Sequence, residues 1–237
     1  MQPYLKINHG LLLLTFLFIG ININAQVTTD YWPNKKKRSI GEMVDSIKLG
    51  AWQYWNENGT PSDSGSYVKL TSEQIRVYVH QEYIDKYKID TLKIKQKDAT
   101  SRKYTETGKW IIRSEKGIVI ETGEYLPMAS ITLDFILDEN NEEIYVYTAS
   151  EPIKIGMWKH YNENGKLAVE QEYIVGDRYG YGMRIEYYQN GIKKQEGIFH
   201  EKHEHWSGPV KFYDEKGKLF KVITYTEHGE EFKVENY

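Results

Sequence analysis

The chain has 237 residues with 31 basic and 34 acidic side chains, and this near balance excludes the strong positive field that gathers nucleic acid or an anionic membrane. It contains no cysteine, which excludes disulfides, thiol catalysis and thiolate metal sites. Its length is sufficient for one substantial folded unit.

Residues 1–25 have the pattern of a secretory signal peptide, with a basic Lys6, an apolar stretch from Leu11 to Ile21 and a small Ala25 before Gln26. The stretch is short for a membrane span, which needs about 20 apolar residues. We therefore expect an exported protein, in the periplasm, on the cell surface or secreted, with no stable membrane span after cleavage. An uncleaved N-terminal anchor is the alternative.

Residues 26–49 follow as a predicted N-terminal arm. They contain the one basic run of the chain, Lys35-Lys36-Lys37-Arg38. Charge runs are usually solvated, so we expect an arm exposed to solvent, with a membrane-surface patch as the alternative.

An internal repeat fills residues 50–237. A starting glycine is followed by a second glycine nine residues later and by an aromatic residue seventeen residues later. This spacing occurs five times, with starting glycines at Gly50, Gly108, Gly156, Gly182 and Gly208. The last three units follow one another with a period of 26 residues.

Each unit is predicted to be a β-hairpin. Sequences such as Asn162-Glu163-Asn164-Gly165 favour a type I turn closed by a left-handed glycine. Aromatic and β-branched residues fill both arms, as strands prefer. Since a single hairpin cannot bury a face, the units are expected to pair into one elongated, twisted antiparallel sheet of an all-β fold.

Two insertions interrupt the repeats, at about residues 68–107 and 126–155. Apolar residues alternate from Ile75 to Val79, and two apolar runs, at 131–135 and 144–147, flank a polar turn. We therefore predict extra strands in both insertions and no long helix.

The repeats resemble the MORN-repeat variant family, which includes YwqK-type antitoxins. The likeness is carried by Gly156-Met157-Trp158 with Tyr161 and Asn164-Gly165-Lys166, and by Gly50-Ala51-Trp52 with Asn58-Gly59. The resemblance implies a binding module made of β-hairpins. Its antitoxin members imply the neutralisation of a partner protein.

The expected function is a non-catalytic protein-binding or scaffolding module of the cell envelope. Tyrosine and tryptophan are enriched at interaction hot spots, so the repeated aromatics are candidate partner contacts. The alternative is a purely structural role, in which they pack between neighbouring hairpins. The candidates are Trp52, Trp110, Trp158, Tyr161, Tyr187 and Tyr213. An antitoxin or immunity protein is the first alternative function, and a carbohydrate-active enzyme or glycan binder is the second.

The sequence gives little support to a catalytic or metal-binding function. No nucleophile elbow, phosphate-binding glycine loop or His-Glu-x-x-His motif is present, and we expect neither enzyme activity nor a cofactor. The one candidate metal site is the histidine cluster His200, His203 and His205, because imidazole suits zinc, copper and nickel. A polar loop is the simpler interpretation of that cluster, since Lys202 lies within it.

Overall fold

The structure is a computed structural model that describes residues 26–79, 81–137, 140, 143–147, 151–174, 181–201 and 203–237. The predicted signal peptide, residues 1–25, and Lys202 lie outside the described residues. Thirteen strands form the main path of one sheet, in which consecutive strands pair antiparallel. They are β1 (Gln26–Tyr31), β2 (Lys37–Val44), β3 (Ile47–Trp55), β4 (Pro61–Lys69), β6 (Tyr104–Arg113), β7 (Val119–Leu137), β9 (Glu151–Tyr161), β10 (Leu167–Tyr173), β11 (Tyr181–Tyr187), β12 (Lys193–His200), β13 (His205–Tyr213), β14 (Leu219–Tyr225) and β15 (Glu231–Asn236).

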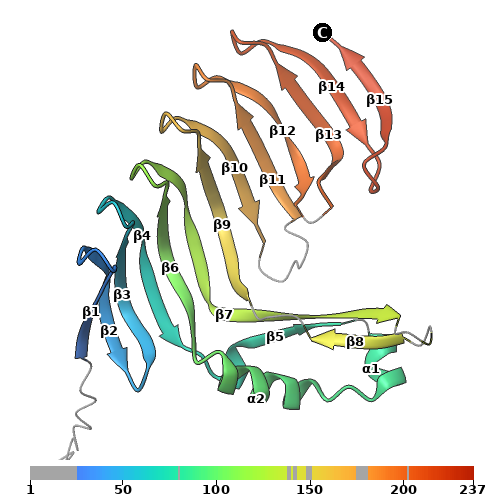
Figure 1. Ribbon diagram of the computed structural model, residues 1–237. Helices are drawn as coiled ribbons and strands as arrows, with labels where there is room; N and C mark the ends of the chain where they lie inside the picture. The colour runs from blue at the N-terminus through green and yellow to red at the C-terminus, as the bar shows by residue number, and fades with distance from the viewer. Residues whose placement is uncertain are drawn as a thin grey trace, which may run out of the picture.

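The sheet is an open, curved strip that runs from β1 at one end to β15 at the other (Figure 1). The five predicted repeats are the hairpins β3–β4, β6–β7, β9–β10, β11–β12 and β13–β14. The prediction of an all-β, elongated antiparallel sheet of repeated hairpins is confirmed.

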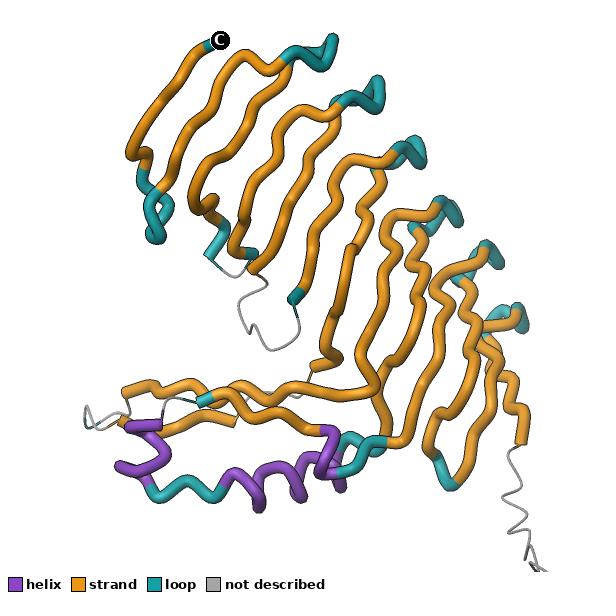
Figure 2. The backbone as a smooth tube through the Cα atoms, turned by 180° about the vertical axis from the view of Figure 1, so that it is seen from behind, coloured by secondary structure: helices purple, strands orange, loops and turns teal. Residues whose placement is uncertain are grey.

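The repeat turns line one rim of the strip (Figure 2). At Gly165 the backbone has φ 72°, and its N–H donates to the carbonyl oxygen of Asn162 at 2.8 Å. The Asn162 N–H donates to the Lys166 carbonyl at 2.9 Å, which closes the loop. Side-chain amides join neighbouring turns, and the donor–acceptor pairs are Asn34–Glu57 (2.8 Å), Asn58–Glu115 (2.9 Å) and Asn190–Glu215 (3.0 Å).

This turn geometry yields a stability prediction. Gly165→Val is expected to lower the free energy of unfolding by more than about 1 kcal/mol, because a β-branched residue resists positive φ. Gly165→Asn is the matched control and is expected to cost less, since asparagine tolerates this conformation. Urea denaturation measures both, and equal stabilities for the valine and asparagine variants would contradict the assignment.

The N-terminal segment is not an arm. Residues 26–49 form β1, β2 and the start of β3, and the β1–β2 hairpin adds one further repeat to the sheet. Its turn places Lys35, at φ 64°, where the other units have glycine. The basic run is therefore part of the fold: Lys36 Nζ donates to the Asn58 carbonyl at 2.6 Å, and Arg38 lies 3.5 Å from Asp30.

The prediction that the first insertion consists of strands is only partly right. It contains one strand, β5 (Ile75–Tyr78), together with a 3₁₀ turn (Ser72–Gln74) and two helices, α1 (Gln81–Tyr87) and α2 (Thr91–Ser101). The carboxylate of Asp90 caps α2 by accepting the N–H groups of Leu92 and Lys93 at 3.1 Å each.

The second insertion lengthens β7, which then turns back as β8 (Glu143–Tyr147). This antiparallel pair confirms the predicted hairpin. β5 pairs with β7 in parallel, from Ile75 opposite Ala129 to Tyr78 opposite Thr132. The two insertions therefore build one unit, called the insertion module here. It projects from the rim of the strip that lies opposite the repeat turns (Figures 1 and 2).

The insertion module has its own apolar core. Its buried members are Leu70, Ile75, Ile89, Ala129, Ile131 and Leu133. Ile94 and Ala99 of α2 pack against this cluster, which explains why the helix lies along β5. Neither helix in the described part of the chain has the length and apolar character needed to cross a membrane.

Candidate functional site

The three repeat tryptophans, Trp52, Trp110 and Trp158, lie on one side of the sheet, called the tryptophan face here. They are 4%, 6% and 0% exposed. Each indole lies over a glycine of the preceding hairpin, and the pairs are Gly41–Trp52, Gly65–Trp110 and Gly123–Trp158. A Cβ at any of these glycines would overlap the ring, so glycine is needed for the hairpins to pack.

Tyrosines alternate with these tryptophans along the tryptophan face. The rings meet edge to face, for example Tyr67 with Trp110 (5.3 Å between centroids) and Tyr125 with Trp158 (4.8 Å). Such pairs add to the stabilisation that burial provides. The core of the strip is therefore a continuous row of aromatic rings from Tyr54 to Tyr173.

This row of rings opens at the second repeat into a pocket of about 310 Å³. Four aromatic side chains line it, contributed by the strands β3, β4, β6 and β7: Tyr54, Tyr67, Trp110 and Tyr125. Lys48, Asp63, Glu106 and Ile112 complete the lining. We call this the aromatic pocket.

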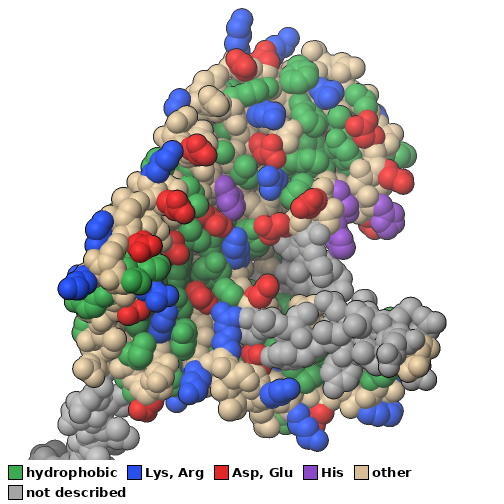
Figure 3. Space-filling model, in the orientation of Figure 1, with side chains coloured by type: hydrophobic (Ala, Val, Ile, Leu, Met, Phe, Trp, Pro, Cys, Tyr) green, Lys and Arg blue, Asp and Glu red, His purple; other side chains and the backbone are tan. Residues whose placement is uncertain are grey.

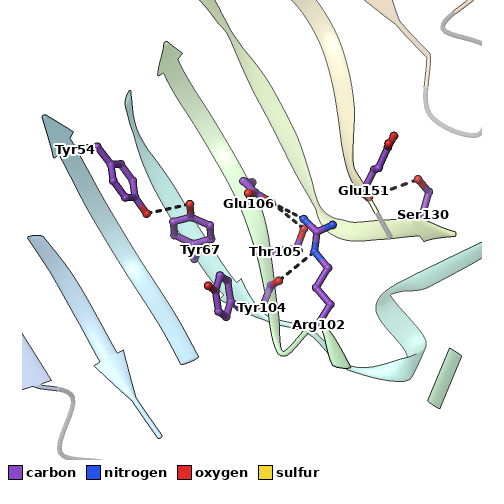
Figure 4. Close-up of polar contacts among 8 residues, drawn as sticks. All are labelled: Tyr54, Tyr67, Arg102, Tyr104, Thr105, Glu106, Ser130 and Glu151. Carbon is purple, nitrogen blue, oxygen red and sulfur yellow. Dashed lines mark hydrogen bonds and ion pairs between the residues drawn. The ribbon is translucent and has the colours of Figure 1, made fainter. Parts of the chain in front are cut away.

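Lys48 and Tyr54 form one wall of the aromatic pocket. Lys48 Nζ donates to the Tyr54 hydroxyl at 2.9 Å and lies 4.8 Å from the Trp52 ring centroid. Tyr54 in turn donates to the Tyr67 hydroxyl at 3.0 Å (Figure 4). Burial, and after it the hydrogen bond with Tyr54, raises the pKa of Tyr67 well above the usual range, so this phenol stays neutral.

Glu106 lies on the opposite side of the aromatic pocket, where the insertion module joins β6. The carboxylate Oε2 accepts a charge-assisted hydrogen bond from Arg102 at 2.8 Å (Figure 4). Arg102 follows α2 directly, so the insertion module fixes the position of this carboxylate. Asp63, by contrast, forms no ion pair with any described residue and accepts a hydrogen bond from the Ser62 hydroxyl at 3.3 Å.

The repeat tyrosines among the candidates lie on the opposite face, because Trp158 and Tyr161 are an odd number of residues apart in β9. Tyr187 donates to Glu170 at 2.5 Å, and Tyr213 donates to Glu196 at 2.6 Å. Each bond ties a hairpin to the preceding one. Burial, followed by the hydrogen bond to the carboxylate, raises the pKa of both tyrosines to about 12.

The raised pKa values of these two tyrosines predict how the stability of the protein changes at high pH. Tyr187 and Tyr213 keep their protons more tightly in the folded state than at the ordinary pKa of 10.0, so their contribution is complete below pH 10 and is lost as the pH rises towards 12. The double variant Tyr187→Phe, Tyr213→Phe is expected to be less stable at pH 8 by about 1 kcal/mol per lost hydrogen bond. Its loss of stability between pH 8 and 11 should be shallower than that of the wild type in urea denaturation. A parallel decline would contradict the assignment.

The candidates therefore do not form one contact surface. The tryptophans are buried, which favours a packing role over direct partner contact for Trp52 and Trp158, whereas Trp110 also lines the aromatic pocket. Tyr161, Tyr187 and Tyr213 are half-buried on the other side of the sheet. The aromatic pocket was missed by sequence reasoning, although Trp110 belongs to its wall.

The three histidines of the candidate metal site lie near one another at the β12–β13 connection. The ring centroids of His200 and His205 are 4.7 Å apart, and those of His203 and His205 are 6.0 Å apart. Within the part of the chain that the structure describes, no group of three or more side chains is arranged to hold a metal ion. The geometry gives the metal hypothesis no support.

Charges of both signs are mixed on the molecular surface. Figure 3 shows acidic and basic side chains scattered among apolar ones, and the molecule is hollowed where the insertion module leaves the sheet. The face in view has no broad area of a single charge.

The MORN repeat variant matches the chain at two places, residues 154–174 and 206–227. Each match begins two residues before a starting glycine and covers one hairpin, β9–β10 in the first case and β13–β14 in the second. No curated protein sequence matches the chain. The chain thus contains MORN-type repeats, which are typical of repeat-type binding modules.

Proposed function

We propose that this protein is an exported, non-catalytic module that binds a partner protein in the cell envelope. The observation that carries the proposal is the aromatic pocket on the tryptophan face, next to the insertion module. Repeat sheets of this kind offer extended surfaces to partners. Aromatic side chains in well-packed pockets are frequent centres of protein interfaces.

The N-terminal sequence supports export. Residues 1–25 have the charge, the apolar core and the small residue before the cleavage point of a signal peptide. Fractionation of cells that express the full chain tests this part of the proposal. Recovery of a shortened chain that begins at Gln26 outside the cytoplasm is the expected result, and recovery of the full-length chain in the cytoplasm would contradict it.

Affinity capture tests partner binding. Tagged protein spanning residues 26–237 is incubated with envelope extract, and a heat-unfolded sample of the same protein serves as the control. We expect one protein to be captured in stoichiometric amount by the folded bait alone. Repeated extracts that yield no such protein would contradict the proposal.

An antitoxin or immunity protein is a special form of the same proposal, in which the partner is a toxin. It is supported by the resemblance of the repeats. Co-expression with a neighbouring candidate toxin is the test, with restored growth as the expected result and continued growth arrest as the contrary one.

A glycan ligand is the second candidate, since the aromatic pocket combines aromatic walls with the carboxylates of Asp63 and Glu106. Titration with envelope oligosaccharides, followed by tryptophan fluorescence, distinguishes it from protein binding. Saturable quenching would favour the glycan, and an unchanged spectrum would favour the protein partner.

A further inference from the structure

The same position differs in chemistry among the first three predicted repeats. Two residues before each starting glycine stand Lys48, Glu106 and Lys154. Lys48 Nζ lies 4.8 Å from the Trp52 ring centroid, and Lys154 Nζ lies 4.2 Å from that of Trp158. In these two repeats an ammonium group from the chain itself therefore covers the tryptophan.

The second repeat has a carboxylate where its neighbours have that ammonium group. Trp110 and Tyr125 keep the same edge-to-face arrangement, with centroids 6.0 Å apart, but here the aromatic pocket opens beside them. The second repeat thus has the tryptophan and the tyrosine of this arrangement, but no lysine at the position equivalent to Lys48 and Lys154.

Negative charge exceeds positive charge in the lining of the aromatic pocket, which has the two carboxylates of Asp63 and Glu106 and one ammonium group, that of Lys48, which is bound to the Tyr54 hydroxyl and lies over Trp52. Burial comes first among the effects that raise the pKa of Tyr125, and the next largest are the negative charges of Glu121, Glu106 and Asp63. Glu121 is paired with Lys154 at 2.7 Å and Glu106 with Arg102 at 2.8 Å, whereas Asp63 has no ion pair with any described residue. Asp63 is therefore the carboxylate that an incoming cation would neutralise.

We infer that the aromatic pocket receives a lysine side chain of the partner protein, whose ammonium group lies over Trp110 and Tyr125 and donates hydrogen bonds to Asp63 and Glu106. This inference rests on the proposed function for the source of the lysine. Tryptophan and tyrosine faces attract an ammonium group, and a lysine has three donors for the surrounding oxygens. Lys48 and Lys154 of this chain show the same kind of contact, since their ammonium groups lie over Trp52 and Trp158.

The test uses n-butylammonium as a mimic of the lysine side chain and n-butanol as its neutral counterpart. The indole N–H of Trp110 is a suitable reporter, since it is buried without a hydrogen-bond acceptor among the described residues. Its NMR resonance is expected to shift saturably with n-butylammonium and not with n-butanol. No saturable shift, or an equal shift with n-butanol, would overturn the inference.

Two variants of the aromatic pocket sharpen the test. Glu106→Lys restores the residue type found in the flanking repeats and should abolish n-butylammonium binding, because the new ammonium group occupies the site. Asp63→Asn removes one charge-assisted hydrogen bond and should weaken binding about tenfold, which keeps the test valid if Glu106→Lys does not fold. Glu124→Lys makes the same charge change on the opposite face and should bind like the wild type. Unaltered binding in both pocket variants would overturn the inference.

Affinity capture with the Asp63→Asn bait separates this inference from the proposed function. Capture of one partner by the wild type and its loss with the variant supports both. Equal capture by the two baits, with no binding of n-butylammonium, overturns the inference and leaves the proposed function in place. Absence of any partner overturns the proposed function and, with it, the lysine as the source of the cation.

Discussion

Trp158→Ala is expected to lower the free energy of unfolding by about 3–5 kcal/mol, the range typical of removing a large buried aromatic side chain. Trp158 is fully buried, its ring packs against Tyr125 and Tyr173, and its Nε1 donates to the Glu124 carbonyl at 3.2 Å. Few neighbours can fill the space that alanine leaves, since the ring lies between two hairpins and over Gly123. Urea denaturation followed by circular dichroism measures the loss.

Met157→Ala is the matched control for this variant. Met157 precedes Trp158 in the same strand but points to the other face and is 41% exposed, so its loss should be much smaller. Similar losses for the two variants would contradict the assignment of the tryptophan face as the core.

Gly123→Ala is expected to cost about 1–3 kcal/mol or more, although alanine normally suits a strand better than glycine does. The reason is steric, because a Cβ at this position would overlap the indole of Trp158. The hairpins β6–β7 and β9–β10 would have to move apart or the ring would have to leave its position. Thermal unfolding of the single variant measures the loss.

A double-mutant cycle separates this overlap from other effects of the alanine. Val210 lies over Gly197 in the last repeats as Trp158 lies over Gly123, and a Cβ at Gly197 would still lie 2.8 Å from the valine Cγ2, so only a smaller residue than valine relieves the overlap. On the Trp158→Ala background, which removes the indole, the Gly123→Ala change should cost much less than in the wild type. Additive losses would show that the glycine is not required by the tryptophan.

The hairpin repeats could be predicted because the residues that specify each hairpin lie close together in the sequence. The turn sequence, the left-handed glycine and the aromatic at offset seventeen all act within about 20 residues, and the structure has these features in order. The first hairpin was missed because Lys35 stands at the glycine position. Tyr31, Gly41 and the later Trp52 were signals that could have shown it.

The helices of the insertion module and the parallel pairing of its strands could not be predicted, because the contacts that form them are not local. β5 pairs in parallel with a part of β7 that lies about fifty residues later. Helix α2 has few apolar residues for a helical pattern, and one of them, Leu92, is 59% exposed. Its stability comes from Asp90 at its start and from packing of Ile94 and Ala99 on the module core, and neither is visible in the periodicity.

The candidate site was only partly predictable for a similar reason. Sequence repetition identified Trp110 as an aromatic of interest but not that Glu106 replaces a lysine of the flanking repeats. Asp63 and Glu106 are separated by forty-three residues and line the same pocket only because β4 pairs with β6. The signal in the sequence was the residue two positions before each starting glycine, which is lysine in the flanking repeats and glutamate at position 106.

Photo-crosslinking in cells tests partner binding at the aromatic pocket most directly. A photoreactive amino acid replaces either Ile112, which lines the aromatic pocket, or its neighbour Ile111, which points to the opposite face and is similarly half-buried. We predict a crosslinked partner protein from position 112 and none from position 111. Equal crosslinking at both positions, or none at position 112, would contradict binding of a partner at this pocket.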